Sequence, residues 1–551
     1  MTTAVEHDEA TQTMTGNEII ARCLRERGVE DIFYLMGGPM LDCELACGDE
    51  GIRMIDVRHE QAAVMMANAY SRLRRCPSVA MAASGPGVAN MVTGVANAWA
   101  DGAPVIAIGG AAPLSGNHRL VFQEVDQVAM FEPITVWSDR CLETRRLPEY
   151  IDLAFRAAFG SRPGPVYLDI PADVLYGRVP VDEVQPSSPT PRLRPQAGAT
   201  EIAAAAELIA RAEKPVVVFG SGVIWSEADE ALRQFVESAR IPFFATPQGR
   251  GVIPEDHPLC FLGARGTAFA ECDLIVEVAT RQSYVISHAE APRWSDGAKL
   301  VQIDIDPTEI GRNRPADAGI VGDARSVLSQ LVEVSDLGPD RHTDWVEELR
   351  QEHLAKLEKA EQRMSTDATP IHPLRLCKAV RDALPRDAVL VVDGQEILTF
   401  GRQSIPFYAP RSLNSGPFGT MGVGVPMALG AKAALPDAKV VVLHGDGSFG
   451  FNAMEIDTAL RHGLPIVCVI SNNGGWTADT PGWRKPGRHL GNTRYDLMFA
   501  PIGAHAEFVE DPGELAAAID RAFESGLPAV VNVLTDPEAR ATGASFTKYE
   551  T

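Results

Sequence analysis

The sequence has few cysteines, and they form no recognisable pattern. Nine occur among the 551 residues, none in a Cys-x-x-Cys arrangement, and the nearest two are Cys43 and Cys47. An odd number of scattered cysteines argues against a disulfide framework and favours reduced thiols, as in a cytoplasmic protein. We therefore expect the cysteines to be small apolar residues of the core.

Long apolar runs and an excess of positive charge are also missing. No run approaches the ~18 apolar residues of a membrane-spanning helix, and the N-terminal segment is polar and acidic, unlike a signal or transit peptide. The 50 Lys and Arg residues stand against 73 Asp and Glu residues, which gives a formal net charge of −23. Because binding to a phosphate backbone needs a basic surface, nucleic acid is not an expected partner. An anionic small molecule would depend on local arginines or helix N-termini.

Short apolar runs typical of buried strands alternate with helical patterns along most of the chain. This alternation predicts an α/β fold in which helices cover both faces of mostly parallel sheets. The runs fall into three groups, so we expect three doubly wound domains. The expected strands span residues 32–36, 78–83, 105–108 and 166–170 in the first group, 215–219, 274–278 and 300–305 in the second, and 389–392, 440–443, 466–470 and 529–533 in the third.

Two segments separate these groups. Prolines are dense between residues 180 and 195, which indicates an extended linker, and a charged helical stretch at 345–364 indicates a connector. The domain boundaries expected from these breaks are 14–180, 198–338 and 370–537. A tail at 538–551 follows and can serve as a lid over a bound ligand.

The third group contains two polar strand ends that belong together. A glycine-rich turn, Gly445-Asp446-Gly447-Ser448, follows one strand, and Asn472-Asn473 ends the next. A helix is expected between them, from about residue 452 to 461. Parallel strands end at the same edge of a sheet, so the Asp446 carboxylate and the Asn473 amide oxygen can meet and, with a backbone carbonyl, bind Mg²⁺. Either piece alone is more simply a tight turn or a loop, and their spacing favours the site.

This spacing resembles the diphosphate and metal signature of thiamine diphosphate-dependent enzymes. The resemblance implies thiamine diphosphate and Mg²⁺ as cofactors, with Asp446, Asn473 and the Gly475 carbonyl as metal ligands. Residues 415–424 resemble the stretch that supplies an apolar wedge under the bent cofactor, which implies that role for Met421, although a core methionine is the alternative. Further cofactor contacts are implied for Gly394, Gln395, Gly419, Gly445, Gly447 and Ser448.

Two segments near the N-terminus resemble the catalytic half of the same family. Residues 58–63 resemble the block that carries the cofactor-activating glutamate, which implies that Glu60 shares a proton with the aminopyrimidine ring. The alternative is a solvated carboxylate at a helix start. Residues 120–127 resemble the active-site loop of acetolactate synthases, which implies that Phe122 lines the pocket and that Gln123 binds a carbonyl or hydroxyl. Glu124 is equally well a structural residue.

The second group resembles 2-hydroxyacyl-CoA lyase and oxalyl-CoA decarboxylase more than other branches of the family. In those enzymes this domain holds ADP, where acetolactate synthase holds FAD. The matching residues here are Arg162, Arg281, Asp304 and Asp323. Arg265 and Arg411 are candidates for contacts with CoA phosphates, although Arg411 is as simply a surface arginine. Trp476 and the insert that follows, at 477–488, depart from the CoA enzymes where the acyl group would bind.

The resemblance implies a carbon–carbon lyase that cleaves a 2-hydroxyacyl-CoA into a carbonyl compound and formyl-CoA, or runs the reverse condensation. It also implies a homodimer or homotetramer with active sites at the subunit interface. An acetolactate synthase-like carboligase or a 2-oxo acid decarboxylase is the alternative. A nicotinamide dehydrogenase fits poorly, because Gly220-Ser221-Gly222 is followed by Trp225 where a third glycine is needed.

Overall fold

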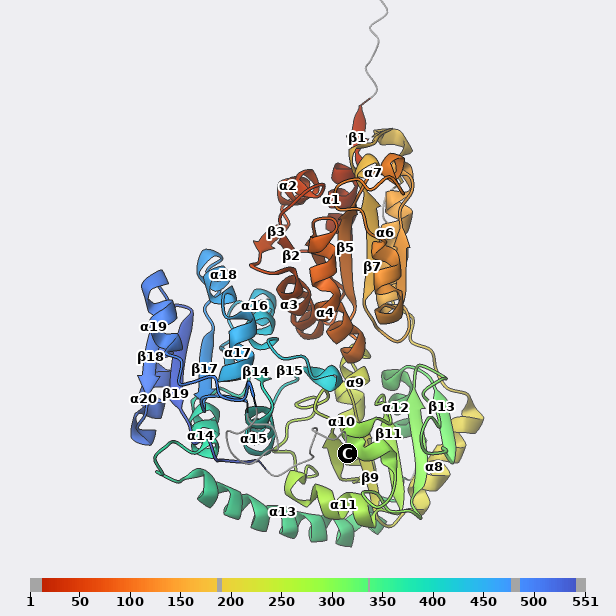
Figure 1. Cartoon of the computed structure of the whole chain (residues 1–551). Coiled ribbons are helices and arrows are strands. Elements are labelled where there is room, and N and C mark those ends of the chain that lie inside the picture. The colour runs from red at the N-terminus through yellow and green to blue at the C-terminus, as the bar shows by residue number, and fades with distance from the viewer. Residues whose placement is uncertain (1–11, 186–190, 335–336, 477–485, 542–551) are drawn as a thin grey trace, which may run out of the picture. The chain divides into compact units, whose positions relative to one another are not determined.

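The computed structural model describes residues 12–185, 191–334, 337–476 and 486–541. It contains three sheets of parallel strands, each flanked by helices (Figure 1), which confirms the predicted α/β class. The chain divides into two compact units: one comprises residues 1–67, 77–99 and 103–192, and the other comprises 68–76, 100–102 and 193–551. All nine cysteines are free and eight of them are buried, as expected. Within the described residues no helix is long and apolar enough to cross a membrane.

The first unit contains a six-stranded sheet of order β3-β2-β4-β5-β7-β6. The chain order reverses between β2 and β4, and this reversal creates a crevice at the carboxyl ends of those strands. The strands are β2 (Asp31–Leu35), β3 (Arg53–Asp56), β4 (Ser78–Ala82), β5 (Val105–Ala111), β6 (Trp137–Arg140) and β7 (Val166–Pro171), and the helices are α1 (Gly16–Glu26), α2 (Leu41–Asp49), α3 (Glu60–Arg74), α4 (Pro86–Asp101), α5 (Gln127–Phe131), α6 (Leu147–Phe159) and α7 (Ala172–Tyr176).

The two ends of the first predicted domain pair with each other. Strand β1 (Thr13–Thr15) runs antiparallel to β8 (Arg178–Pro180). Helix α1 starts directly after β1 with a capping box, in which the Thr15 hydroxyl accepts from the Glu18 backbone N–H and the Glu18 carboxylate accepts from the Thr15 backbone N–H. This local signal fixes where the first helix begins.

The second unit begins with a five-stranded sheet of order β10-β9-β11-β12-β13. Its strands are all parallel, and its switch point lies between β9 and β11. The strands are β9 (Pro215–Phe219), β10 (Phe243–Ala245), β11 (Leu274–Val278), β12 (Lys299–Asp304) and β13 (Ala318–Val321), and the helices are α8 (Ala199–Arg211), α9 (Gly222–Trp225), α10 (Asp229–Ala239), α11 (Arg265–Glu271), α12 (Ala324–Glu333) and the connector α13 (Thr343–Met364).

The same unit ends with a six-stranded sheet of order β15-β14-β16-β17-β19-β18, which repeats the topology of the first sheet. The strands are β14 (Val389–Asp393), β15 (Ser412–Asn414), β16 (Val440–Gly445), β17 (Val467–Asn472), β18 (His505–Val509) and β19 (Ala529–Leu534), and the helices are α14 (Pro373–Ala383), α15 (Glu396–Ser404), α16 (Gly424–Ala434), α17 (Asp446–Asn452), α18 (Glu455–Arg461), α19 (Tyr495–Phe499) and α20 (Leu515–Glu524).

One local prediction in this last sheet is wrong. A glycine-rich turn was expected from Gly445 to Ser448, with a helix starting only near Asn452. Instead α17 begins at Asp446, with Gly445 as its N-cap residue, and a second helix, α18, begins at Glu455. A carboxylate in the first turn of a helix is favoured by the helix dipole, so Asp446 helps to start the helix that was expected further on.

Candidate functional site

Asp446 lies at the carboxyl edge of the last sheet, directly after β16. Its side chain is almost fully buried, and among the described residues its Oδ2 atom has no hydrogen-bond partner. Burial raises the pKa of this carboxyl to about 6, although nearby backbone N–H groups oppose the rise. Burying a carboxylate oxygen that accepts no hydrogen bond costs free energy unless a cation binds to it. This is the first sign that the edge is built for a cation.

Asn473 follows the neighbouring strand β17 and brings a second oxygen to the same place. Its amide oxygen lies 2.8 Å from the Gly475 carbonyl oxygen and 3.2 Å from Asp446 Oδ1. The amide turned round would instead donate hydrogen bonds to both oxygens. Three convergent oxygens from a carboxylate, an amide and a backbone carbonyl are the hard ligands that Mg²⁺ prefers. The three residues predicted as metal ligands are thus brought together, and their chemistry fits the ion.

The strand ends around this edge are closely packed. Gly394, with a φ of +128°, leaves no room for a side chain, because a Cβ there would lie 3.2 Å from the backbone nitrogen of Gly445. The Ser448 hydroxyl donates to the Gly445 carbonyl at 3.0 Å. The Trp476 indole lies against Gly447, where a Cβ would be 2.6 Å from a ring carbon. These contacts hold the first turn of α17 between β14 and the segment after β17.

The remaining predicted cofactor contacts surround open space. Gln395 and Met421 are exposed, the latter by 37%, and nothing lies within 4 Å of the Cβ position of Gly419. An exposed methionine is unlike a core residue, and it leaves an apolar surface for a ligand. The wedge role of Met421 stays a prediction.

A buried polar pair behind the edge was missed by sequence reasoning. Asp393 ends β14, and its Oδ2 accepts from the Gly424 N–H at 2.9 Å and lies 3.7 Å from His444 Nδ1. Burial raises the pKa of Asp393 to about 7 and lowers that of His444 to about 3. The only available signal was one polar residue at the end of each apolar run. We interpret the pair as support for the strand ends that frame Asp446.

Glu60 is the first residue of α3, in the first unit. It is 6% exposed, and the Asn90 side-chain amide donates to its Oε2 at 2.9 Å. The loop after β4 approaches this carboxylate closely, because a Cβ on Gly87 would lie 3.3 Å from Glu60 Oε1. Glu60 is therefore a held carboxylate with little access to solvent, which favours the proton-sharing role over a solvated helix start.

The loop containing Gln123 contacts the Ser84–Gly87 segment. The Ser84 hydroxyl donates to Gln123 Oε1 at 2.5 Å, and Gln123 itself has a φ of +62°. Glu124 accepts from the backbone N–H groups of His118 and Val121, the latter at 3.1 Å, which makes it a residue that closes its own loop. Phe122 is 87% exposed.

The predicted nucleotide residues come from both compact units. Arg162 lies in the loop after α6 in the first unit, whereas Arg281, Asp304 and Asp323 belong to the second unit. Arg281 donates to the Ala100 carbonyl. Nucleotide binding by these four residues stays a prediction.

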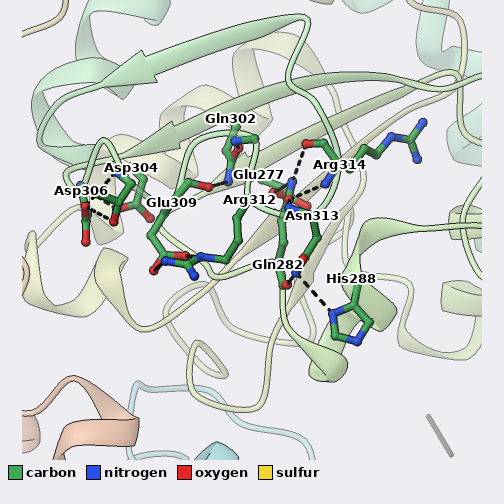
Figure 2. Close-up of polar contacts among 12 residues, drawn as sticks. Glu277, Gln282, His288, Gln302, Asp304, Asp306, Glu309, Arg312, Asn313 and Arg314 are labelled. Carbon is green, nitrogen blue, oxygen red and sulfur yellow. Dashed lines mark hydrogen bonds and ion pairs between the residues drawn. The ribbon is translucent and has the colours of Figure 1, made fainter. Parts of the chain in front are cut away.

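The two aspartates of this set already make local contacts. Asp304 accepts from the Asp306 N–H at 2.9 Å (Figure 2). Asp323 caps α12, accepting from the Ser326 N–H at 3.3 Å and from the Ser226 hydroxyl.

The glycines of the Gly-x-Gly motif have a packing role. A Cβ on Gly220 would lie 2.7 Å from the Ala279 carbonyl oxygen, and one on Gly222 would lie 2.6 Å from the Ala279 side chain. They let β9 and β11 approach closely at their carboxyl ends. The motif therefore needs no dinucleotide to explain it, which removes the main support for the dehydrogenase alternative.

Arg265 begins α11 and has a strongly cationic environment. Its Nε has no hydrogen-bond partner among the described residues, and its guanidinium lies 4.9 Å from the centre of the Phe269 ring. Burial and, to a smaller extent, the positive charges of Arg293, Arg250 and Arg402 together lower its pKa to about 10. An arginine that is buried beside other arginines needs an anion to offset the repulsion.

Arg402, in α15, is a second buried cation of this cluster and was not predicted. Burial, with the charge of Arg250, lowers its pKa to about 10, and its Nη2 donates only weakly, at 3.4 Å, to the amide oxygen of Asn414. Arg250 is neutralised by Glu255 through two bonds of 2.6 and 2.5 Å. Arg265 and Arg402, which are half-buried, and the exposed Arg293 therefore form a cationic cluster in an acidic protein.

Arg411 is placed differently. It precedes β15, donates to the Asp387 carbonyl and lies 3.7 Å from the Asp387 carboxylate. Because the strands are parallel, this is the opposite edge of the sheet from Asp446. Its contact with CoA stays a prediction, as do the roles of the insert and the tail, where residues 477–485 and 542–551 lie outside the described residues.

Comparisons with known proteins agree with this geometry. Three family models match: the N-terminal thiamine pyrophosphate (TPP) binding domain over residues 14–130, the central domain over 202–331, and the C-terminal TPP binding domain over 397–533. The chain is 36% identical to a probable acetolactate synthase of Mycobacterium bovis, with 96% of each chain covered. It is 33% identical to the 2-hydroxyacyl-CoA lyase of Arabidopsis thaliana, covering 96% of this chain and 97% of that one. It is also 33% identical to the oxalyl-CoA decarboxylase of Escherichia coli, with 98% of each covered. The chain therefore belongs to the thiamine pyrophosphate enzyme family.

Proposed function

We propose that this thiamine diphosphate-dependent enzyme is a carbon–carbon lyase that cleaves a 2-hydroxyacyl-CoA into a carbonyl compound and formyl-CoA, or runs the reverse condensation. The single observation that carries this proposal is the group of like charges formed by the half-buried Arg265 and Arg402 together with the exposed Arg293. We also propose a cytoplasmic homodimer or homotetramer that uses Mg²⁺.

The arginine cluster fits a phosphate-bearing substrate. The chain has a net charge of −23, so its overall field repels anions, and only a local cluster can attract them. Guanidinium groups match phosphate oxygens through paired hydrogen bonds. A CoA thioester carries phosphates far from its reacting carbon, whereas a free 2-oxo acid has none. Phosphate contacts of this kind would anchor the substrate and help to position the reacting carbon.

The proposed cofactor roles fall on residues of each unit. Asp446, Asn473 and the Gly475 carbonyl would hold Mg²⁺ against the diphosphate, and Glu60 would hold a proton at the aminopyrimidine ring. When bound, the cofactor supplies a nucleophilic ring carbon and an electron sink next to the substrate carbonyl. Gln123 would donate a hydrogen bond to the substrate oxygen. In the proposed oligomer, Glu60 of one subunit serves a cofactor held by Asp446 of the partner subunit.

The second candidate is an acetolactate synthase-like carboligase or 2-oxo acid decarboxylase. It is supported by the 36% identity to a probable acetolactate synthase, which is slightly higher than the 33% identity to the 2-hydroxyacyl-CoA lyase. The flavin of such an enzyme would occupy the crevice near Arg281, and ADP is the expected occupant in the CoA branch.

A substrate screen separates the candidates. Purified enzyme with thiamine diphosphate and Mg²⁺ is given 2-hydroxyacyl-CoA thioesters or free 2-oxo acids, and products are separated chromatographically. Formation of formyl-CoA supports the proposal. Condensation of two pyruvates, together with a flavin absorption band and no turnover of thioesters, would replace it with the second candidate.

A further inference from the structure

Gln127 is a buried glutamine that no prediction assigned a role. It is the first residue of α5 and is 1% exposed. Its Oε1 accepts from the Gly85 N–H at 2.6 Å, and its Nε2 donates to the Gly110 carbonyl at 3.0 Å and to the Asp169 carboxylate. If the amide were turned round, its NH₂ group would face the N–H donor of Gly85. Its oxygen would then face two acceptors, the Gly110 carbonyl and the Asp169 carboxylate. The orientation is therefore fixed by its neighbours.

The far side of Gln127 is anchored in the sheet. Asp169, in β7, is fully buried and pairs with Arg140 of β6. The Tyr167 hydroxyl donates to Asp169 Oδ1 at 2.7 Å and accepts from Gln127 Nε2 at 3.0 Å. Burial raises the pKa of Tyr167 well above its ordinary value, so the hydroxyl stays protonated. Gln127 is thus tied to β5 through the Gly110 carbonyl and to β7 through Tyr167 and Asp169.

The near side of Gln127 holds the segment that contacts both predicted catalytic residues of this unit. A Cβ on Gly85 would lie 2.8 Å from Gln123 Cβ, and Ser84 donates to the Gln123 side-chain oxygen at 2.5 Å. Ser84 thereby leaves the NH₂ group of Gln123 to face a substrate oxygen. Two residues further on, Gly87 makes the close approach to Glu60. A shift of Gly85 would move the surroundings of both side chains together.

We propose that Gln127 is a positioning residue, which holds the Ser84–Gly87 segment so that Gln123 and Glu60 keep their places relative to each other. The inference rests on the proposed roles of Gln123 and Glu60. It adds a contact that neither the motif nor the family match assigns, because the buried amide acts through Gly85 rather than on the cofactor. Asp446 and Asn473 belong to the other unit.

The test compares Gln127→Met, which keeps the length of the side chain but can neither accept from Gly85 nor donate to Asp169, with a matched control. Ser78→Ala is the control, because it removes another buried hydrogen bond of this unit, from Ser78 to the Ala67 carbonyl at 2.7 Å. Five quantities are measured: the melting temperature, amide exchange of residues 84–90 without cofactor, the affinity for thiamine diphosphate, the rate of cofactor C2-proton exchange, and the rate of turnover.

We expect Gln127→Met to increase amide exchange in residues 84–90 and to slow C2-proton exchange and turnover at least tenfold, while cofactor affinity stays within about twofold. Ser78→Ala should lower the melting temperature to a similar degree and leave turnover within about twofold. Should Gln127→Met not fold, Gln127→Glu replaces it, because a protonated carboxyl has the same shape and can still accept from Gly85. Turnover of Gln127→Glu should then fall as the pH rises and the carboxyl loses that proton.

This design distinguishes failure of the inference about Gln127 from failure of the proposed role of Glu60. C2-proton exchange and turnover within about twofold of the wild type in Gln127→Met would overturn the inference. If the wild-type enzyme exchanges the C2 proton no faster than free cofactor, the proposed role of Glu60 fails instead. Amide exchange of residues 84–90 then decides the inference, and unchanged protection in Gln127→Met would overturn it.

Discussion

Glu277 provides a test of the structure that needs no substrate. It lies in the middle of β11, fully buried, with its Oε2 accepting from Gln282 at 3.1 Å and its Oε1 without a partner among the described residues. Figure 2 shows it beside Gln302, Gln282 and Asn313. Burial raises its pKa from 4.5 to about 8. The neutral acid is therefore the form that this site accommodates.

The sign and size of the effect follow from that pKa. Between pH 4.5 and about 8 the folded chain binds the Glu277 proton more tightly than the unfolded chain does, so stability falls as the pH rises through this window. A shift from 4.5 to about 8 corresponds to a loss on the order of 5 kcal/mol at most. Glu277→Gln carries no charge and mimics the protonated acid, so it should avoid this loss.

The assay is the melting temperature of the full chain from pH 5 to pH 9, in wild type and Glu277→Gln. The variant should match the wild type at pH 5 and melt several degrees higher at pH 9. Other titrating groups affect the melting temperature of both proteins equally, so their contributions cancel when the two melting temperatures are subtracted. Glu347→Gln is the control, because Glu347 is exposed and its pKa is lowered to about 2 by Arg350, so no gain at high pH is expected. A difference between wild type and Glu277→Gln that does not change with pH would refute the reasoning.

The remaining predictions concern the proposed chemistry. Glu60→Gln should remove nearly all turnover while calorimetry still shows cofactor binding, and wild-type turnover would refute its role. Asp446→Ala should abolish Mg²⁺-dependent retention of thiamine diphosphate in dialysis, because the diphosphate would lose its counter-charge. Arg265→Ala should weaken CoA binding by about 2 kcal/mol at low salt and by less at high salt, whereas Arg233→Ala, on the exposed face of α10, should not. Truncation after Pro537 should raise the KM for the thioester or lower turnover.

The central strands were predictable because a strand that is buried on both faces consists almost entirely of apolar residues. The predicted strands at 215–219 and 274–278 match β9 and β11 residue for residue, and both are interior strands with apolar residues at nearly every position. The missed strands β3, β6, β10, β13, β15 and β18 are all at sheet edges. An edge strand is short and partly exposed, so its composition resembles that of a loop.

The candidate site was predictable where a functional polar residue directly follows an apolar strand in the sequence. Asp446 and Asn473 each follow an apolar strand directly, and parallel pairing of β16 with β17 brings them to one edge. Arg402 and Gln127 could not be found in this way. Each lies on a helix whose sequence pattern does not indicate a functional role. Each acquires its role from contacts with residues far away in the sequence.

The same distinction explains why the family was clear from the sequence and the substrate was not. A diphosphate and a metal ion are bound by strand ends and first helical turns, whose geometry is set by short-range sequence. The acyl and CoA parts of a substrate would be bound by side chains such as Arg265 and Arg402, which come from different sheets of the second unit. These arginines matter because their positive charges lie close together, and only folding brings them together. The proposed substrate class therefore depends on the grouping of these arginines in the folded chain, which no motif contains.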